Sequence, residues 1–175
     1  VSRLFGAKDF ARMRTAVTTA FIACLAMSLG LTAFGYVFCA PMMRWIHTPG
    51  DIFSDGALYL RIYVFGLTFL FLYNVCTGIF TALGDSKTPL YFLIGSSAGN
   101  IFLDCLFVAV FHWGVAGVAW ATFIAQGISA FLALVTLAGR LRHFRLDRHV
   151  PLFDWGLLMR IAAIAVPSIM QQSVL

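Results

Sequence analysis

Long runs of residues without a charged side chain constrain this chain more than any other feature. No charged residue lies between Arg14 and Arg44, and none lies between Arg61 and Asp85. A helix needs about 20 apolar residues to cross the hydrocarbon core of a bilayer, and these runs are longer. Hydrophobic residues make up 61% of the chain and charged residues 11%, far from the balance of a soluble domain. The sequence therefore predicts an all-α fold, a polytopic transmembrane helix bundle.

Four complete spans are predicted from these runs and from the turn residues between them. They cover residues 16–40, 61–84, 89–111 and 115–138. Gly84 is expected to close the second span in the left-handed conformation, and Thr88 with Pro89 to begin the third as N-cap and first helical residue. Gly114 and Gly117 are expected to allow a close turn into the fourth span. Spans two and three are therefore predicted to form a tight hairpin, and span three to turn closely into span four.

The part of the chain after the fourth span has a different composition. Residues 139–154 form a basic segment, expected to be a cytoplasmic linker. Residues 155–175 begin a fifth span, expected to be broken by Pro167 and truncated. Residues 1–138 are thus predicted to be part of one lobe, and the missing remainder of the same chain is an expected partner.

The distribution of Lys and Arg predicts the orientation of the bundle. Of the 12 Lys and Arg residues, only Arg44 and Arg61 fall on one side of the alternating path. The other side carries Arg3, Lys8, Arg12, Arg14, Lys87, Arg140, Arg142, Arg145, Arg148 and Arg160. Because cytoplasmic loops are enriched in basic residues, we expect that side to be cytoplasmic and the protein to lie in the inner membrane. The basic residues flank spans and form no stripe with exposed aromatics, so nucleic acid is not an expected partner.

No pattern of residues indicates catalysis. The four cysteines lie in apolar segments at spacings that fit neither a zinc site nor a disulfide framework. The chain contains no HExxH or CxxC motif and no phosphate-loop glycine pattern. We therefore expect neither an enzyme nor a cofactor, and no metal beyond Na⁺ at the site described next.

Asp104 is the acidic residue inside the apolar tract of the third predicted span. Asn100 lies four residues before it on the same helix face, and Thr122 and Gln126 share a face of the next span. At a rise of about 1.5 Å per residue, Asp104 is expected level with Thr122, and Asn100 with Gln126. An acid in a membrane costs about 2.5 to 3.5 kcal/mol on insertion scales, which favours a functional role.

Two interpretations of these polar faces remain open. In the first, Asp104 exchanges a proton or binds a monovalent cation with oxygen ligands from Asn100 and Thr122. In the second, the polar side chains only hydrogen-bond neighbouring helices, at about 0.6 kcal/mol each. Asn74 and Thr77, in the second span, are cavity candidates for which helix packing is an equally good interpretation.

Several segments, in order and spacing, carry a resemblance to a known family. They are Thr81-Ala82-Leu83-Gly84-Asp85-Ser86-Lys87-Thr88-Pro89, Asn100-Ile101-Phe102-Leu103-Asp104, Gly114-Val115-Ala116-Gly117-Val118-Ala119-Trp120-Ala121-Thr122, and the shorter Phe5-Gly6-Ala7-Lys8-Asp9 and Val166-Pro167-Ser168-Ile169-Met170-Gln171. Together they resemble the multidrug and toxic compound extrusion (MATE) family, in the prokaryotic branch related to the damage-inducible efflux protein.

The resemblance implies that the four spans correspond to helices three to six of a twelve-helix, two-lobed exporter, followed by the start of helix seven. It also implies a cation site in which an Asp from helix one joins an Asn and an Asp from helix five and a Thr from helix six. Asn100, Asp104 and Thr122 match the last three. The helix-one partner and the second lobe have no counterpart in this chain.

These observations favour part of a secondary active efflux antiporter, coupled to H⁺ or Na⁺, for a small organic, cationic or amphipathic substrate. Gln126, Asn74 and Thr77 are the candidates for lining the substrate cavity. A lipid-linked sugar flippase of the same superfamily is one alternative, although no Lys or Arg lies inside a complete span to hold a pyrophosphate. A channel or passive membrane scaffold is the other, and would make Asp104 a packing residue.

Overall fold

The computed structural model describes residues 1–142 and 151–174, and its regular structure is helical. The elements are α1 (Ser2–Gly6), α2 (Phe10–Trp45), α3 (Gly50–Ala82), α4 (Lys87–Cys105), the π-helical turn η1 (Leu106–Val110), α5 (Gly114–Arg142) and α6 (Trp155–Val174). Within these residues, four helices are long and apolar enough to cross a membrane. The predicted all-α fold is confirmed, and each of the four predicted spans overlaps one of these helices.

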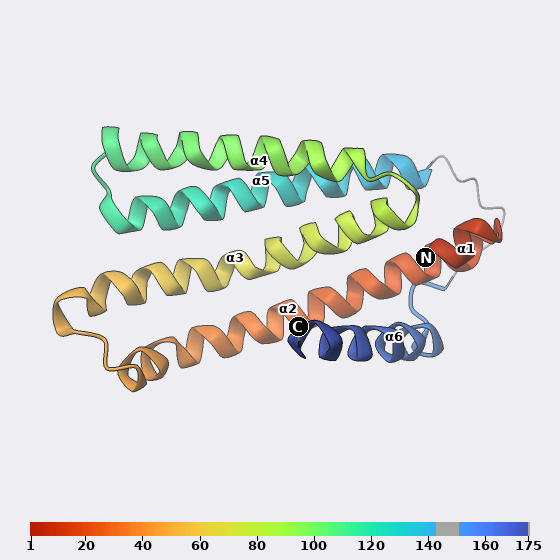
Figure 1. Ribbon diagram of the computed structural model, residues 1–175, viewed down its shortest axis with the longest axis horizontal. Helices are drawn as coiled ribbons and strands as arrows, with labels where there is room; N and C mark the ends of the chain where they lie inside the picture. Colours follow the sequence, from red (N-terminus) through yellow and green to blue (C-terminus); the bar gives the residue numbers. More distant parts are fainter. Residues whose placement is uncertain (143–150, 175) are drawn as a thin grey trace.

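The long helices lie side by side in the order α2, α3, α5, α4 (Figure 1). The helix α3 packs against both α2 and α5, and α5 packs in turn against α4. The helix α6 lies against α2 on the side away from α3 (Figure 1). The bundle thus consists of two hairpins, α2–α3 and α4–α5, joined through contacts between α3 and α5.

The helices α2 and α3 extend beyond their predicted spans. The helix α2 has 36 residues, begins at the cap formed by Asp9, and contains Pro41 in its interior. At 1.5 Å per residue it is about 54 Å long, well above the ~30 Å of a hydrocarbon core. The helix α3 begins at Gly50, eleven residues before the predicted start. Charged residues mark where the apolar run stops, but the helix stops only where a cap or turn ends it.

The turn between α3 and α4 confirms one prediction and corrects another. Gly84 adopts φ 82°, the left-handed conformation expected of it. Thr88 is not the N-cap, because α4 begins at Lys87. Instead, the Asp85 carboxylate accepts hydrogen bonds from the Thr88 backbone N–H at 3.1 Å and the Thr88 hydroxyl at 2.7 Å. Asp85 therefore satisfies the free donor that the first turn of α4 presents.

Asp85 also joins this turn to the end of α5. One of its oxygens accepts a hydrogen bond from the Arg140 guanidinium at 2.5 Å, and the two side chains form an ion pair. The hydrogen bonds from the Thr88 hydroxyl and N–H, followed by the charge of Arg140, lower the pKa of Asp85 from its usual value. Because Asp85 pairs with Arg140, the α3–α4 turn and the last turn of α5 lie at the same end of the bundle. Residues 139–142 of the predicted linker are helical, and residues 143–150 lie outside the described residues.

The connection between α4 and α5 is built from the π-helical turn and a short loop. Gly114 has φ 55°, as its predicted turn role requires. Gly117 is inside α5, and its lack of a side chain serves packing: a Cβ there would lie 3.0 Å from the Cβ of Phe107. Gly117 therefore allows the turn to lie close to α5, as predicted.

The helix α6 begins at the predicted position, Trp155. Asp154 caps it by accepting a hydrogen bond from the Leu157 N–H at 3.1 Å, and its own N–H donates to the buried Thr19 hydroxyl of α2 at 3.1 Å. Pro167 lies inside α6, so the predicted break at this residue is not observed. The start of α6 is thus attached to α2.

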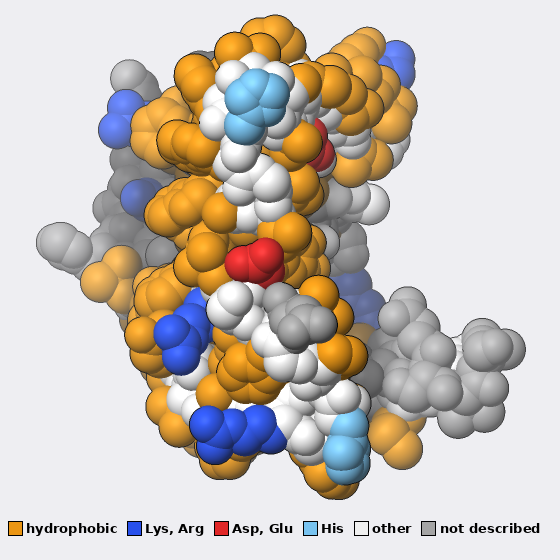
Figure 2. Space-filling view, turned by 90° about the vertical axis from the view of Figure 1, so that its left-hand side faces the viewer, with side chains coloured by type: hydrophobic (Ala, Val, Ile, Leu, Met, Phe, Trp, Pro, Cys, Tyr) orange, Lys and Arg blue, Asp and Glu red, His pale blue; other side chains and the backbone are white. Residues whose placement is uncertain are grey.

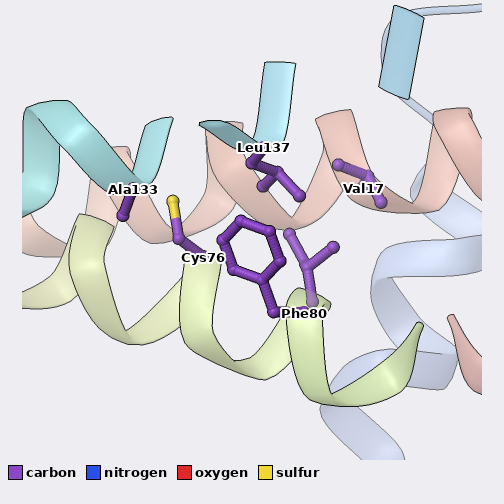
Figure 3. Packing of buried hydrophobic residues seen from close by; sticks show 6 residues of the cluster. Val17, Cys76, Phe80, Ala133 and Leu137 are labelled. Atoms are coloured by element: carbon purple, nitrogen blue, oxygen red, sulfur yellow. The ribbon is translucent and has the colours of Figure 1, made fainter. Parts of the chain in front are cut away.

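The best-packed part of the bundle lies where α2, α3 and α5 meet. Val17 of α2, Phe80 and Cys76 of α3, and Leu137 and Ala133 of α5 converge there (Figure 3). Each is at most 3% exposed. This cluster is at the same end of the bundle as Asp85 and Arg140, so apolar packing and an ion pair together hold that end.

The opposite end and the sides of the bundle present mainly hydrophobic side chains. The view onto the end that carries the α2–α3 and α4–α5 loops shows mostly apolar surface with few Lys or Arg side chains (Figure 2). Large side chains such as Phe34, Ile94 and Phe131 are more than half exposed along the helices. Such faces suit hydrocarbon or further transmembrane helices, in agreement with the predicted bilayer environment.

Candidate ion-coupling site

The structure brings Asn100 and Thr122 together across the α4–α5 interface. The side-chain amide of Asn100 donates a long hydrogen bond of 3.5 Å to the Thr122 hydroxyl. The sequence predicts both residues for one site but places Asn100 level with Gln126. In the structure Asn100 is level with Thr122 instead, about one helical turn away, because the loop between α4 and α5 includes the wide π-helical turn.

Asp104 follows Asn100 by one turn of α4, just before that π-helical turn. Its Oδ1 atom is buried and has no hydrogen-bond partner among the residues that the structure describes. Buried polar atoms are nearly always paired, and an unpaired one costs about 1 to 3 kcal/mol. The carboxylate therefore has the geometry of a group whose partner is supplied by something else: a proton, a cation, water or another helix.

A cavity of about 290 Å³ lies in the α4–α5 groove beside Asn100. Its lining includes Gly95, Ser96 and Gly99 of α4, and Ala125 and Ser129 of α5. The glycines and the alanine make room, and the lining is predominantly apolar, as is typical of small-molecule sites. Leu103, the neighbour of Asp104 in the chain, also contributes to the lining. The polar pair and the cavity are thus parts of one interface.

Gln126 does not line this cavity. Its Oε1 lies over Gly66 of α3, where a Cβ on the glycine would be only 2.8 Å away. Gly66 is buried, and Phe69 and Phe123 pack edge to face at 5.3 Å beside it. Gln126 therefore occupies the α3–α5 contact, one helical turn along α5 from Thr122, which contacts Asn100 of α4.

Asn74 and Thr77 are likewise outside the cavity. The Asn74 amide donates to the Leu70 carbonyl of its own helix at 2.8 Å, and the side chain is exposed. Thr77 is half-buried, and its backbone carbonyl accepts a hydrogen bond from the Thr81 hydroxyl at 2.9 Å. The structure thus places Asp104, Asn100 and Thr122 in one region, and Gln126, Asn74 and Thr77 elsewhere.

The chemistry of the three residues suits a hard, singly charged ion. Asp104 offers a carboxylate, Asn100 an amide oxygen and Thr122 a hydroxyl, and oxygen donors of this kind hold cations such as Na⁺. Among the described residues, no group of three His, Cys, Asp or Glu side chains gathers to hold a metal ion. The four cysteines are free thiols. A transition-metal centre is therefore not supported by this part of the chain.

The sequence analysis did not predict the ion pair between Asp85 and Arg140. Arg140 counts there only as a determinant of orientation, and the two residues are 55 positions apart. One signal was present: both residues fall on the predicted cytoplasmic side, where the ends of the second and fourth spans must meet.

Comparisons with known proteins agree with this architecture. The MatE family matches residues 1–106. The probable multidrug resistance protein YoeA of Bacillus subtilis is 31% identical over 176 residues, covering 96% of this chain and 38% of that protein. The probable multidrug resistance protein YpnP of the same organism is 36% identical over 132 residues, 75% of this chain and 29% of that protein.

A solved structure has the same fold. The inward-facing conformation of a multidrug resistance MATE family transporter of the MOP superfamily superposes with a TM-score of 0.79 at 19% sequence identity. The match covers 95% of this chain and 38% of that structure. This chain therefore spans 29% to 38% of the length of these proteins. It belongs to the MatE family, the MATE transporters that its motifs resemble.

Proposed function

We propose that this chain is part of a secondary active efflux antiporter of the inner membrane. It exports a small organic, cationic or amphipathic substrate in exchange for H⁺ or Na⁺. The two Bacillus subtilis relatives are named probable multidrug resistance proteins, which supports small-molecule transport. Because the chain covers only 29% and 38% of those relatives, transport is a property of the longer protein that carries it.

The observation that carries the proposal is the buried, unpaired Oδ1 of Asp104 next to the contact between Asn100 and Thr122. In a passive scaffold, an unpaired acid in an apolar interface would only lower stability, because burying a carboxylate without a partner costs free energy. An ion or proton that arrives and leaves supplies the missing partner in one state of the cycle. The difference between the affinities of the two conformational states for the ion limits how strongly ion binding can drive substrate transport.

The cavity beside this site gives coupling a physical route. Gly99 and Leu103 line the cavity, and each is next in the chain to a proposed ion-site residue, Asn100 or Asp104. Charging or neutralising Asp104 changes the position and hydration of α4. The same helix forms one wall of the cavity, so ion and substrate act on one element.

The experiment is dye efflux from membrane vesicles that contain the full-length transporter with and without Asp104→Asn. An outward substrate flux is driven in turn by an imposed proton gradient and an imposed sodium gradient. We expect the substitution to abolish the response to one gradient, which identifies the coupling ion. Thr18→Val is the matched control, because the Thr18 hydroxyl donates to the Arg14 carbonyl of its own helix α2, outside the interface, and it should retain that response. An Asp104→Asn protein that is folded and transports at the wild-type rate with either gradient contradicts the proposal.

A further inference from the structure

The π-helical turn η1 and the loop after it lie close against α5 at Gly117. A Cβ at this position would meet the Phe107 Cβ at 3.0 Å, the Trp113 Cβ at 3.1 Å and the Phe107 carbonyl carbon at 3.3 Å. Cβ and backbone carbon atoms cannot move aside by rotating a side chain. A larger residue at Gly117 therefore has to displace the π-helical turn itself.

The outer end of α4 is held in its wide turn by backbone bonds and by aromatic packing. The Phe111 N–H donates to the Leu106 carbonyl at 3.1 Å, and the Trp113 N–H donates to the Phe107 carbonyl at 3.0 Å. The rings of Phe107, Phe111 and Trp113 pack together, with centroids 5.1 to 5.9 Å apart. The turn thus forms one unit that rests on α5 at Gly117.

Asp104 lies between two contacts that join α4 to α5. Asn100, one turn before it, contacts Thr122, and Phe107, about one turn after it, contacts Gly117. Along the helix these contacts are about 6 Å and 4.5 Å from Asp104. They fix the distance between α4 and α5 at the level of the carboxylate. The Oδ1 atom of Asp104, which is buried and has no hydrogen-bond partner among the described residues, lies on the stretch between these two contacts.

We propose that the contact between Phe107 and Gly117 is a positioning device that sets how tightly Asp104 holds its ion. Phe107 and Gly117 touch neither ion nor substrate. They act by holding the π-helical turn and α5 together next to Asp104, so that the buried Oδ1 atom takes its partner from the ion rather than from water. This inference rests on the function proposed above for Asp104. It adds two residues that the resemblance to the family does not assign.

The test substitutes Gly117→Ala in the full-length transporter and measures substrate efflux against the concentration of the coupling ion. The added Cβ displaces the π-helical turn, admits water beside Asp104 and weakens ion binding. We expect the half-saturating ion concentration to rise by about threefold or more, within the range of known coupling mutations. Gly127→Ala is the matched control on the same helix, since its Cβ would meet Phe69 at an ordinary 3.6 Å. It should leave that concentration unchanged.

Each outcome decides between the alternatives. A Gly117→Ala protein with normal folded yield and an unchanged ion dependence overturns the inference. If Gly117→Ala fails to fold, Phe107→Leu weakens the same contact by removing the ring that packs on Phe111 and Trp113 and holds the turn against α5, and it should shift the same concentration. An unchanged ion dependence in that variant, or failure of both variants to fold, makes the contact merely structural. Asp104→Asn in the same assay separates the two proposals. If it leaves coupling intact, the proposed function itself is wrong.

Discussion

Two aspartates of this chain, Asp85 and Asp104, lie in contrasting hydrogen-bonding environments. Asp85, at the turn between α3 and α4, accepts hydrogen bonds from Thr88 and pairs with Arg140. Asp104, in the α4–α5 interface, has a buried oxygen without a partner among the described residues. The first carboxylate joins three helices beside the best-packed cluster of the bundle. The second lies between α4 and α5, next to a cavity of about 290 Å³.

The difference separates a structural acid from a candidate functional one. A carboxylate with donors and a cation around it stabilises the fold and has no capacity left for a ligand. A carboxylate without them costs stability, and that cost is removed each time an ion or proton binds. The comparison therefore predicts that changes at Asp85 alter stability with little effect on coupling, and that changes at Asp104 do the reverse.

The largest effect on stability is expected from Asp85→Ala. The substitution removes the cap of α4, about 1 kcal/mol, and an ion pair whose Arg140 side chain is 53% exposed, at most about 1 kcal/mol. The free energy of unfolding should fall by about 1 to 2 kcal/mol, measured by thermal or denaturant unfolding in detergent. The ion dependence of transport should be retained. A loss of ion coupling with unchanged stability would reverse the roles of the two regions.

Acidification gives a smaller effect at the same site. Because the pKa of Asp85 is lowered in the folded protein, its contribution to stability is complete above the usual value of 3.8 and is lost as pH falls through the folded value. Unfolding midpoints measured from pH 6 downward should therefore decrease in wild type below about pH 4. The decrease should be smaller in Asp85→Asn, which retains a side-chain oxygen for the Thr88 N–H. Identical pH profiles would contradict the assignment.

The smallest effect is expected at a neutral contact between α2 and α3, away from the α4–α5 interface. The Thr32 hydroxyl lies 3.3 Å from both the Val64 carbonyl and the Thr68 hydroxyl. Hydrogen bonds between membrane helices contribute about 0.6 kcal/mol on average, so Thr32→Val should lower stability by about that amount. Efflux assays should detect no change in coupling. A large loss of transport would extend the functional region to a third interface.

The spans could be predicted from sequence because a bilayer imposes a simple rule. Hydrocarbon requires every backbone donor and acceptor to be paired inside the helix, so a long charge-free run has few alternatives. Because of the same rule, an acid inside such a run stands out, which identified Asp104. Its membrane depth, estimated from the helical rise, predicted that it lies near Asn100 and Thr122. These predictions depend only on residue type, helical rise and chain order.

The remaining features depend on contacts between residues far apart in the chain. The ion pair of Asp85 with Arg140 requires two helix ends to meet at one point, which no local pattern encodes. The orientation of Gln126 toward Gly66 depends on how α5 is rotated against α3. The π-helical turn after Asp104 changes how α4 leads into α5. Asn100 therefore lies level with Thr122, about one helical turn from Gln126, its predicted neighbour in depth.

The central claim is that the Asp104 carboxylate gains and loses a proton or Na⁺ during transport. Infrared difference spectroscopy of the purified full-length transporter, with and without Asp104→Asn, measures this directly as pH and sodium concentration are changed. The account predicts a carboxyl band that changes with one of these ions in the wild type and is absent from the variant. Identical difference spectra for the two proteins would contradict it.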